Sequence, residues 1–323
     1  MTPQEWRDQH REQAPDRRER RTANLRADDG LSERDVKQRV RDGRLVRLRR
    51  GVLTDRTAET PVQRHLQLAR AVALQRSEPV FSHVTAAVAW GLPVNSRNLD
   101  RVWLTRRRGH GHGRTVPDAV ESQSSLRAEE IAVASGLVVT SVARTVVDLG
   151  RTSALEWGVA AADAALHRGL CTRDDLEAAV AAGRGRRGIA RAARAVAFAD
   201  PRAESPLESV SRLTISRTDL PQPVLQHPIV LAGRKVATSD FAWLDEKVVG
   251  ECDGAVKYGA LLADGQSAQD AVLAEKRREE LIREAGWWVV RWDWKTAWDR
   301  QRLAQRLRSA LGFQSLGPAA RSA

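Results

Sequence analysis

The spacing of apolar residues predicts a helix followed by a hairpin in residues 30–54. Leu31, Val36 and Val40 recur at helical spacing behind Ser32, which is a good N-cap, and an Asp-Gly pair ends the helix. The next run, "RLVRLRRGVLT", alternates apolar and polar residues as a β-hairpin does. A helix followed directly by a basic hairpin is the layout of a winged helix-turn-helix.

The following stretch is rich in alanine at helical spacing. In "PVQRHLQLARAVALQ", Leu66, Ala69, Ala73 and Leu74 share one side of a helix. Strands are expected only at "RVWLTRRR" and "LVVT", and helices over most of the remainder. The pattern therefore predicts a helix-rich middle domain.

The pattern changes again after a linker expected at "GRGRRG". A helix at "SPLESVSRLTISR" precedes three strand runs, "PVLQHPIVL", "KVATSDFAW" and "EKVVGECDG". A long amphipathic helix, the strand "WWVVRWDW" and a basic helix follow. The order is αβββαβ, with the valines at 248–249 and 289–290 expected among the buried residues. We expect an α+β or α/β multidomain protein, with a basic arm and winged helix at 1–58, a middle domain at 59–198, an αβββαβ domain at 199–315 and a disordered tail at 316–323.

Charge indicates the class of partner. Lys and Arg exceed Asp and Glu by 53 to 41, which gives a net charge of +12. This balance favours a polyanion, with nucleic acid ahead of an anionic membrane. No apolar run has the length of a membrane span, the N-terminus has no apolar signal core, and Cys171 and Cys252 lie too far apart to form a metal-ligand pair. Double-stranded DNA as the partner, no membrane and a cytoplasmic location are therefore expected.

The basic residues of the helix and hairpin are the candidates for contact with DNA. A helix can enter the major groove while arginines of the wing hold phosphates. The alternative is a small solvated helix whose arginines only maintain solubility. The expected DNA contacts are Arg34, Lys37, Arg41, Arg44, Arg47, Arg49 and Arg50.

Three acids at the ends of two expected strands are the candidates for chemistry. Glu251 and Asp253 share a strand face because side chains alternate, and Asp240 lies on the preceding strand. Such carboxylates can hold Mg²⁺ or Mn²⁺, which can polarise a phosphodiester and activate water. Glu208 can add a further acid, although a capping role explains it equally well. The alternative is that Asp253 belongs to a turn and that Asp240 caps or pairs with an arginine.

Two histidine-containing motifs are weaker candidates. Ser82-His83 with Asp148 or Asp163 could form a hydrolase constellation, but Ser82 is better explained as a helix cap. The loop at 106–114, "RRRGHGHGR", is either a basic loop near a phosphate or an idle solvated loop.

The phrase from Gly30 to Val52 resembles the N-terminal winged-helix segment of AbiEi-type antitoxins of abortive-infection toxin–antitoxin systems. The middle stretch resembles the scaffold-like portion of AbiEi-like chains. This resemblance implies DNA binding and a cognate toxin as a possible partner.

The third region resembles the restriction-endonuclease-like PD-(D/E)XK core, and most of all the Vsr-type endonuclease-like family, through "SDFAW", "GECDGAVKYG" and "AEKRREELIREAGWWVVRWDW". The resemblance implies that Asp240 and Glu251 bind the metal ion. The family has lysine where this chain has Asp253, so Lys257 or Lys276 is the candidate replacement.

Two functions remain open from the sequence. One is a metal-dependent DNA endonuclease of defence or repair, guided by the winged helix. The other is a non-catalytic antitoxin-like transcriptional regulator that retains a degenerate nuclease fold.

Overall fold

The protein has an α+β fold with three separate sheets. The computed structural model describes residues 19–23, 25, 29–106, 118–253 and 268–315. The chain forms two units: residues 1–161 with 169–197, and residues 162–168 with 198–323. None of the described helices is both long and apolar enough to cross a membrane. Most of the expected arm, the basic loop after Arg106 and the C-terminal tail at 316–323 lie outside the described residues.

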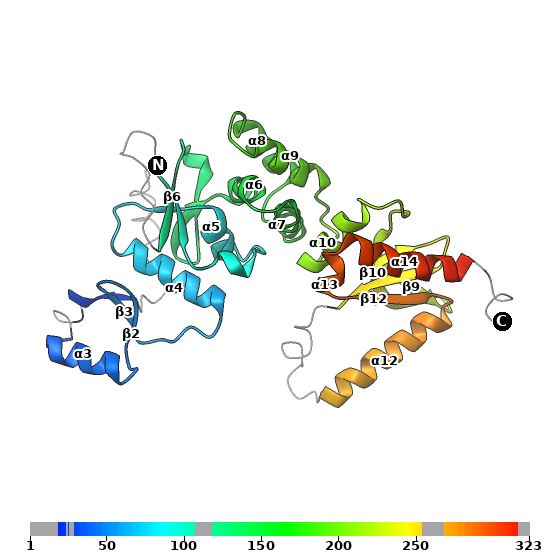
Figure 1. The fold of residues 1–323 in the computed structure, drawn as a ribbon, viewed down its shortest axis with the longest axis horizontal. Coiled ribbons are helices and arrows are strands. Elements are labelled where there is room, and N and C mark those ends of the chain that lie inside the picture. The colour runs from blue at the N-terminus through cyan, green and yellow to red at the C-terminus, as the bar shows by residue number, and fades with distance from the viewer. Residues whose placement is uncertain (1–18, 24, 26–28, 107–117, 254–267, 316–323) are drawn as a thin grey trace. The chain divides into compact units, whose positions relative to one another are not determined.

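The N-terminal part of the first unit is a short helix packed on a small antiparallel sheet (Figure 1). Its elements are β1 (Arg20–Arg21), α3 (Glu33–Arg41), β2 (Val46–Arg49) and β3 (Val52–Thr54), with strand order β1-β3-β2. Ser32 begins α3 as expected, because its hydroxyl accepts from the Asp35 N–H while the Asp35 carboxylate accepts from the Ser32 N–H. The small core contains Leu25, Val36, Leu45 and Leu53.

The middle part contains a five-stranded mixed sheet, more β-structure than the sequence indicated. The strands are β4 (Val80–Phe81), β5 (Val102–Arg106), β6 (Ala119–Gln123), β7 (Ile131–Ala134) and β8 (Leu137–Thr140), in the order β6-β5-β4-β8-β7. Two of these strands were expected, and β4, β6 and β7 were not. Helices α4 (Pro61–Ala73) and α5 (His83–Trp90) contribute to the core above Phe81, Leu104 and Val139.

Four further helices complete this part of the chain. They are α6 (Val142–Thr152), α7 (Leu155–His167), α8 (Arg173–Ala182) and α9 (Ile189–Phe198). The segment 183–188, which we expected to be a linker, joins α8 to α9 and packs on α6: the Arg187 carbonyl accepts from Arg151 Nε at 3.1 Å. Gly188 has φ +83°, and a Cβ atom there would lie 2.4 Å from the Arg151 carbonyl oxygen, so a side chain does not fit.

The second unit has a four-stranded sheet between helices. It consists of α10 (Pro206–Ile215), β9 (Val224–Leu231), β10 (Arg234–Trp243), β11 (Val248–Cys252), α12 (Ala268–Glu284), β12 (Trp288–Trp292), α13 (Trp294–Ala297) and α14 (Arg300–Ser315). The strand order is β12-β11-β10-β9, with β12 parallel to β11 and the other pairs antiparallel. The order of elements is the one that the apolar pattern indicated.

Two apolar clusters cover the two faces of this sheet. Phe241 and Val248 pack against residues of α10 and α14, whereas Ala242 and Val249 pack against Ile282 of α12. Val248, Val249 and Val290 are buried as expected, and Val289 is half-buried. The acids at the end of β11 therefore lie in a sheet whose two faces are both covered.

Candidate functional site

The exposed side of α3 carries three of the expected DNA contacts. Arg34, Lys37 and Arg41 are all exposed, because Val36 and Val40 turn the opposite side of the helix toward the small core. Lys37 pairs with Glu33 one turn earlier at 2.7 Å, an ion pair in which both side chains are two-thirds exposed. Such a pair contributes little to stability, so it leaves the lysine available to a phosphate.

The hairpin that follows α3 supplies the other four residues, in different environments. Arg44, Arg47 and Arg50 are exposed, and Arg44 forms a surface ion pair with Asp42. Arg49 is mostly buried: its Nε atom lies 3.1 Å from Asp118 Oδ2. Its guanidinium is therefore already neutralised within the protein, and Arg49 is the weakest of the seven candidates for contact with DNA.

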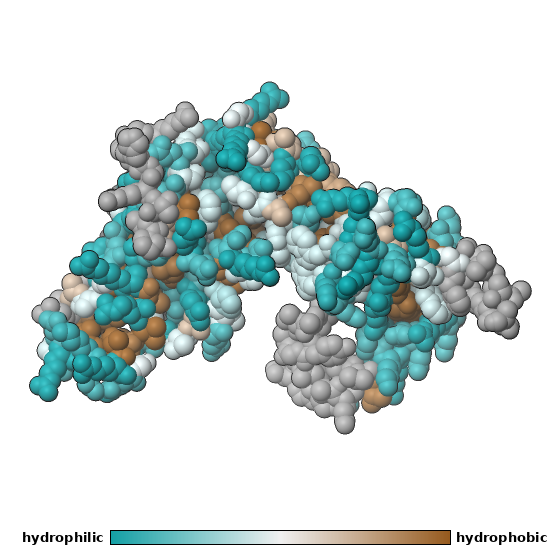
Figure 2. Space-filling model, viewed as in Figure 1, coloured by the Kyte–Doolittle hydropathy of each residue, from teal (hydrophilic) through white to brown (hydrophobic). Residues whose placement is uncertain are grey.

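Unpaired cations remain on this surface. Among the described residues, Arg34, Arg41, Arg47 and Arg50 have no carboxylate within ion-pair distance. Figure 2 shows hydrophilic residues over α3, next to a hydrophobic patch. A short helix and a hairpin with four uncompensated guanidiniums can hold phosphate oxygens along a duplex.

The acids of the second unit lie close in the sheet, as the strand pairing shows. β10 pairs with β11 so that Phe241 faces Gly250. The next position in this register places Asp240 opposite Glu251. Here the Asp240 carboxylate replaces a strand carbonyl, since the Cys252 N–H donates to Asp240 Oδ2 at 2.7 Å. Asp240 thus has a structural role at the point where the two strands separate.

Glu251 is engaged by two arginines. Its Oε1 atom lies 2.6 Å from Arg278 Nη1, and its Oε2 atom lies 3.0 Å from Arg291 Nη2. Burial raises the pKa of Glu251, and the two guanidiniums oppose that rise. Burial alone would lower the pKa of Arg291, but the charges of Glu251 and Glu275 raise it. The direct ion pairs indicate a carboxylate that is ionised and already compensated at neutral pH.

Glu208 lies next to Asp240 and is hardly exposed. Its Oε2 atom accepts from the Glu204 N–H and from Gln226 Nε2, both at 3.0 Å. Ser205 caps α10, because its hydroxyl accepts from the Glu208 N–H. The capping role considered for Glu208 is directed to the Glu204 N–H and not to the Ser205 N–H. Burial and the charge of Asp240 raise the pKa of Glu208, and its hydrogen bonds partly oppose that rise.

Metal binding by these acids stays a prediction. Within the described part of the chain, no three His, Cys, Asp or Glu side chains form a group that could hold a metal ion. Asp253 is exposed, and Lys276 is exposed on α12. Lys257 lies outside the described residues. In the structure, Asp240 and Glu208 accept from peptide N–H groups and Glu251 pairs with two arginines.

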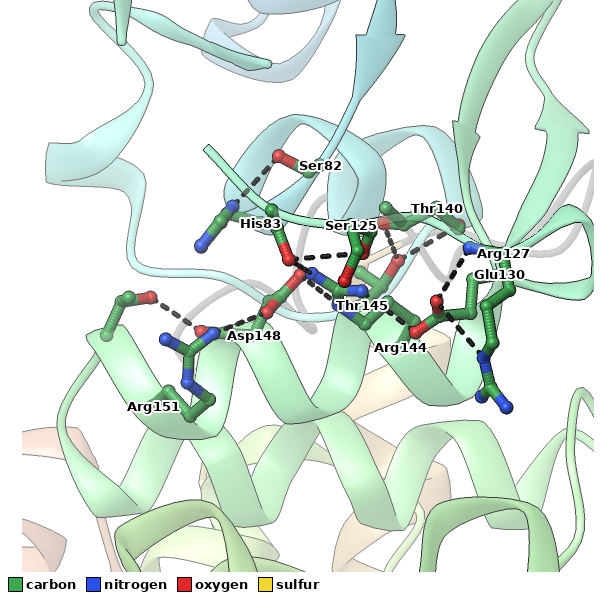
Figure 3. A network of polar contacts seen from close by, with 12 residues as sticks. Ser82, His83, Ser125, Arg127, Glu130, Thr140, Arg144, Thr145, Asp148 and Arg151 are labelled. Carbon is green, nitrogen blue, oxygen red and sulfur yellow. Dashed lines mark hydrogen bonds and ion pairs between the residues drawn. The ribbon is translucent and has the colours of Figure 1, made fainter. Parts of the chain in front are cut away.

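A buried polar network in the middle domain was not anticipated as a unit (Figure 3). Arg144 is 2% exposed and donates to Asp148 at 2.8 Å, to Glu130 at 2.8 Å and to Ser124 at 3.1 Å. Arg151 donates to the second oxygen of Asp148 at 2.8 Å. Burial would raise the pKa of Glu130, but bonds from the Arg127 N–H and Arg144 more than offset it, so this pKa is lowered.

Ser82 and His83 lie above this network, at the start of α5 (Figure 3). The Ser82 hydroxyl and His83 Nδ1 are 2.9 Å apart, and Ser82 makes no side-chain bond to the helix N-terminus, so it does not cap α5 by a side-chain bond as expected. Burial lowers the pKa of His83, which keeps the ring neutral. Both oxygens of Asp148 bind arginines and Asp163 pairs with Arg212, so these residues do not assemble a hydrolase triad.

The sequence does contain a partial signal for the network. Arg144 and Asp148 are four residues apart on one helix, the spacing of an intrahelical ion pair. Strands β7 and β8 lie between Glu130 and Arg144 in the sequence. Sequence spacing therefore does not identify Glu130 as a partner of Arg144. The geometry suits a structural role, since each guanidinium nitrogen of Arg144 donates to an acceptor within the protein.

A family match covers this middle domain. Residues 79–196 match the family described as "AbiEi antitoxin C-terminal domain", a segment that includes the buried network. Two curated relatives from Mycobacterium tuberculosis, "Uncharacterized protein MT2308" of strain CDC 1551 / Oshkosh and "Uncharacterized protein Rv2248" of strain ATCC 25618 / H37Rv, are each 38% identical over 156 residues. The match covers 48% of this chain and 55% of each relative, so the chain spans about half the length of the curated relatives it matches.

Proposed function

We propose that the protein is a DNA-binding regulator of the antitoxin type, in which the N-terminal helix and hairpin bind duplex DNA and the AbiEi-type domain at 79–196 supports them. The observation that carries the proposal is the set of uncompensated arginines on α3 and its hairpin, within the same unit as that domain. A helix followed by an arginine-rich hairpin would act as a winged helix-turn-helix, with α3 in the major groove and the hairpin along the phosphates.

The support for this proposal is electrostatic as well as topological. The chain carries a net charge of +12, so long-range attraction would bring it to a polyanion before specific contacts form. Phosphate contacts would set the register of the protein on DNA, and residues of α3 would read base edges. Arg34, Lys37 and Arg41 are the candidates for that reading, because they share the exposed side of the helix.

A toxin protein is the proposed second partner. This part of the proposal rests on the family of residues 79–196 alone. Co-purification of the chain with the product of a neighbouring gene would test it, and repression without any such complex would limit the antitoxin role to transcription.

Metal-dependent cleavage of DNA remains a prediction from the sequence, and it is not the function that we propose. The reason is the charge balance at Glu251, whose carboxylate has two arginine partners in place of a cation. Plasmid nicking with Mg²⁺ or Mn²⁺, beside an Asp240→Asn variant, would restore that reading if the wild type cut and the variant did not.

A footprinting experiment tests the proposed function. The full chain would be titrated onto a duplex from upstream of its own coding sequence and onto a scrambled duplex of equal length. We expect a protected segment on the first duplex only, and repression of a reporter placed behind it. Equal affinity for both duplexes with no protected segment would refute a regulatory role.

A further inference from the structure

The acidic end of β11 carries an arrangement of charges that the proposed function does not use. Glu251 is buried, with its side chain 8% exposed. Arg278 of α12 and Arg291 of β12 approach it from two directions, at 2.6 Å and 3.0 Å. Two acids of α12 complete the group: Glu275 lies 3.4 Å from Arg278 and pairs with Arg291, and Glu279 lies 3.3 Å from Arg291.

We infer that Arg278 and Arg291 form a clamp on Glu251 that takes the place of a divalent cation, so that the folded protein does not bind Mg²⁺ or Mn²⁺ at this end of the sheet. Each oxygen of Glu251 has a guanidinium nitrogen within 3.0 Å. A metal ion would have to displace at least one arginine from a site where that arginine is less than one-third exposed.

The clamp also holds α12 on the sheet. Arg278 Nη2 donates to the Thr238 carbonyl of β10 at 2.9 Å while Nη1 faces Glu251. One side chain of α12 thereby bridges two neighbouring strands. The apolar attachment of α12 lies further along, at Ile282, which is fully buried against Val249. Arg278 is thus a second, polar attachment, one turn before the apolar one.

The charge count explains why removal of an arginine should create a cation site. Glu251 and Glu275 carry two negative charges and share Arg278 and Arg291, whereas Glu279 pairs with both Arg291 and Arg283. Without Arg278, Glu251 and Glu275 would depend on Arg291 alone in a partly buried position. Clustered carboxylates of this kind repel one another and attract a cation with oxygen-preferring chemistry.

The first experiment measures Mn²⁺ binding to the full chain by the loss of the free-ion signal in electron paramagnetic resonance. Wild type and Glu251→Gln are titrated in parallel with Mn²⁺ alone. We expect the two titrations to coincide, because Glu251 is already occupied. Mn²⁺ binding by the wild type that Glu251→Gln abolishes would overturn the inference. This result is independent of DNA binding, so it would leave the proposed function standing.

The second experiment opens the clamp. Arg278→Gln is compared with Arg283→Gln, a control on the same helix whose arginine is 63% exposed and pairs with Glu279 at 2.5 Å. We expect Arg278→Gln to lower the melting temperature and to recover part of the loss when Mn²⁺ is added, since a ligand that binds only the folded state stabilises it. The control should show neither effect. An Arg278→Gln variant that melts like the control, with and without Mn²⁺, would show that Arg278 neither anchors α12 nor excludes the cation.

Discussion

Simultaneous replacement of Arg34, Arg41, Arg47 and Arg50 by glutamine should reveal how many phosphates the N-terminal surface neutralises. Each phosphate contact contributes about 0.9 to the slope of log affinity against log salt for B-form DNA. Four contacts would therefore give a slope difference of up to about 3.6 between wild type and variant. Between roughly 50 and 200 mM salt, that difference corresponds to about a hundredfold change in affinity from these residues alone.

The assay is fluorescence anisotropy of a labelled duplex at four or more salt concentrations. The matched control removes the same charge from the second unit, by changing Arg234, Arg277, Arg300 and Arg306 to glutamine; all four are exposed. We expect a reduced slope for the N-terminal variant and a smaller change for the control. Equal slopes in wild type and N-terminal variant would refute the assignment of DNA contacts, and an equal fall in both variants would show only an effect of total charge.

Three further predictions concern stability. Arg144→Met should destabilise the protein by about 3 kcal/mol in urea denaturation, because it removes one partner of buried ion pairs. The control Arg127→Met, at a side chain that is 58% exposed, should lower the free energy of unfolding by less than about 1 kcal/mol. Equal losses in the two variants would contradict the structural role of the network. Glu208→Gln should stabilise the protein near neutral pH, because the pKa of Glu208 is raised in the folded state. The gain in stability over wild type should vanish as the pH falls through that pKa. A gain that persists in acid would exclude the raised pKa as its cause. Gly188→Ala should lower the melting temperature more than Gly169→Ala, because both glycines have positive φ but only the first lacks room for a Cβ atom; similar losses would contradict the steric argument.

Local signals made the N-terminal helix and hairpin predictable. Ser32 and Asp35 close a capping box within four residues, and alternation after Gly43 sets the hairpin. These features depend on neighbours in sequence, so the pattern alone specifies them. DNA binding by this helix and hairpin involves contacts with another molecule, and the apolar pattern carries no information about those contacts.

The five-stranded sheet was harder to predict because tertiary pairing outweighs local propensity there. β4 has only two residues, and β6 reads "AVESQ", with a single β-branched residue. Glu121 lies in β6 because its strand pairs with β5, where Leu104 is its partner. The spacing of apolar residues in the sequence does not indicate that β6 pairs with β5.

The acidic site at the end of β11 also has one part that the sequence predicts and one part that it does not. The alternation of β11 predicts that Glu251 and Asp253 share a face, and the register with β10 brings Asp240 to Glu251. The clamp could not be predicted, because Arg278 and Arg291 come from a helix and a strand that meet Glu251 only in the fold. Spacing identifies a helical pair such as Glu275 and Arg278 but not which arginine reaches a buried acid.

The chain enters the second unit twice, and this path limits how the two units can be separated by recombination. Residues 162–168, which include the end of α7, belong to the second unit, and residues 169–197 return to the first. Arg212 of α10 pairs with Asp163 of α7 at 2.9 Å, and the Asp200 N–H donates to the same carboxylate. A recombination that transfers only residues 198 onward would leave Arg212 and the Asp200 N–H without their acceptor, and one that starts before 162 would also transfer part of the first unit. No single crossover separates the two units cleanly, so we expect them to be inherited together.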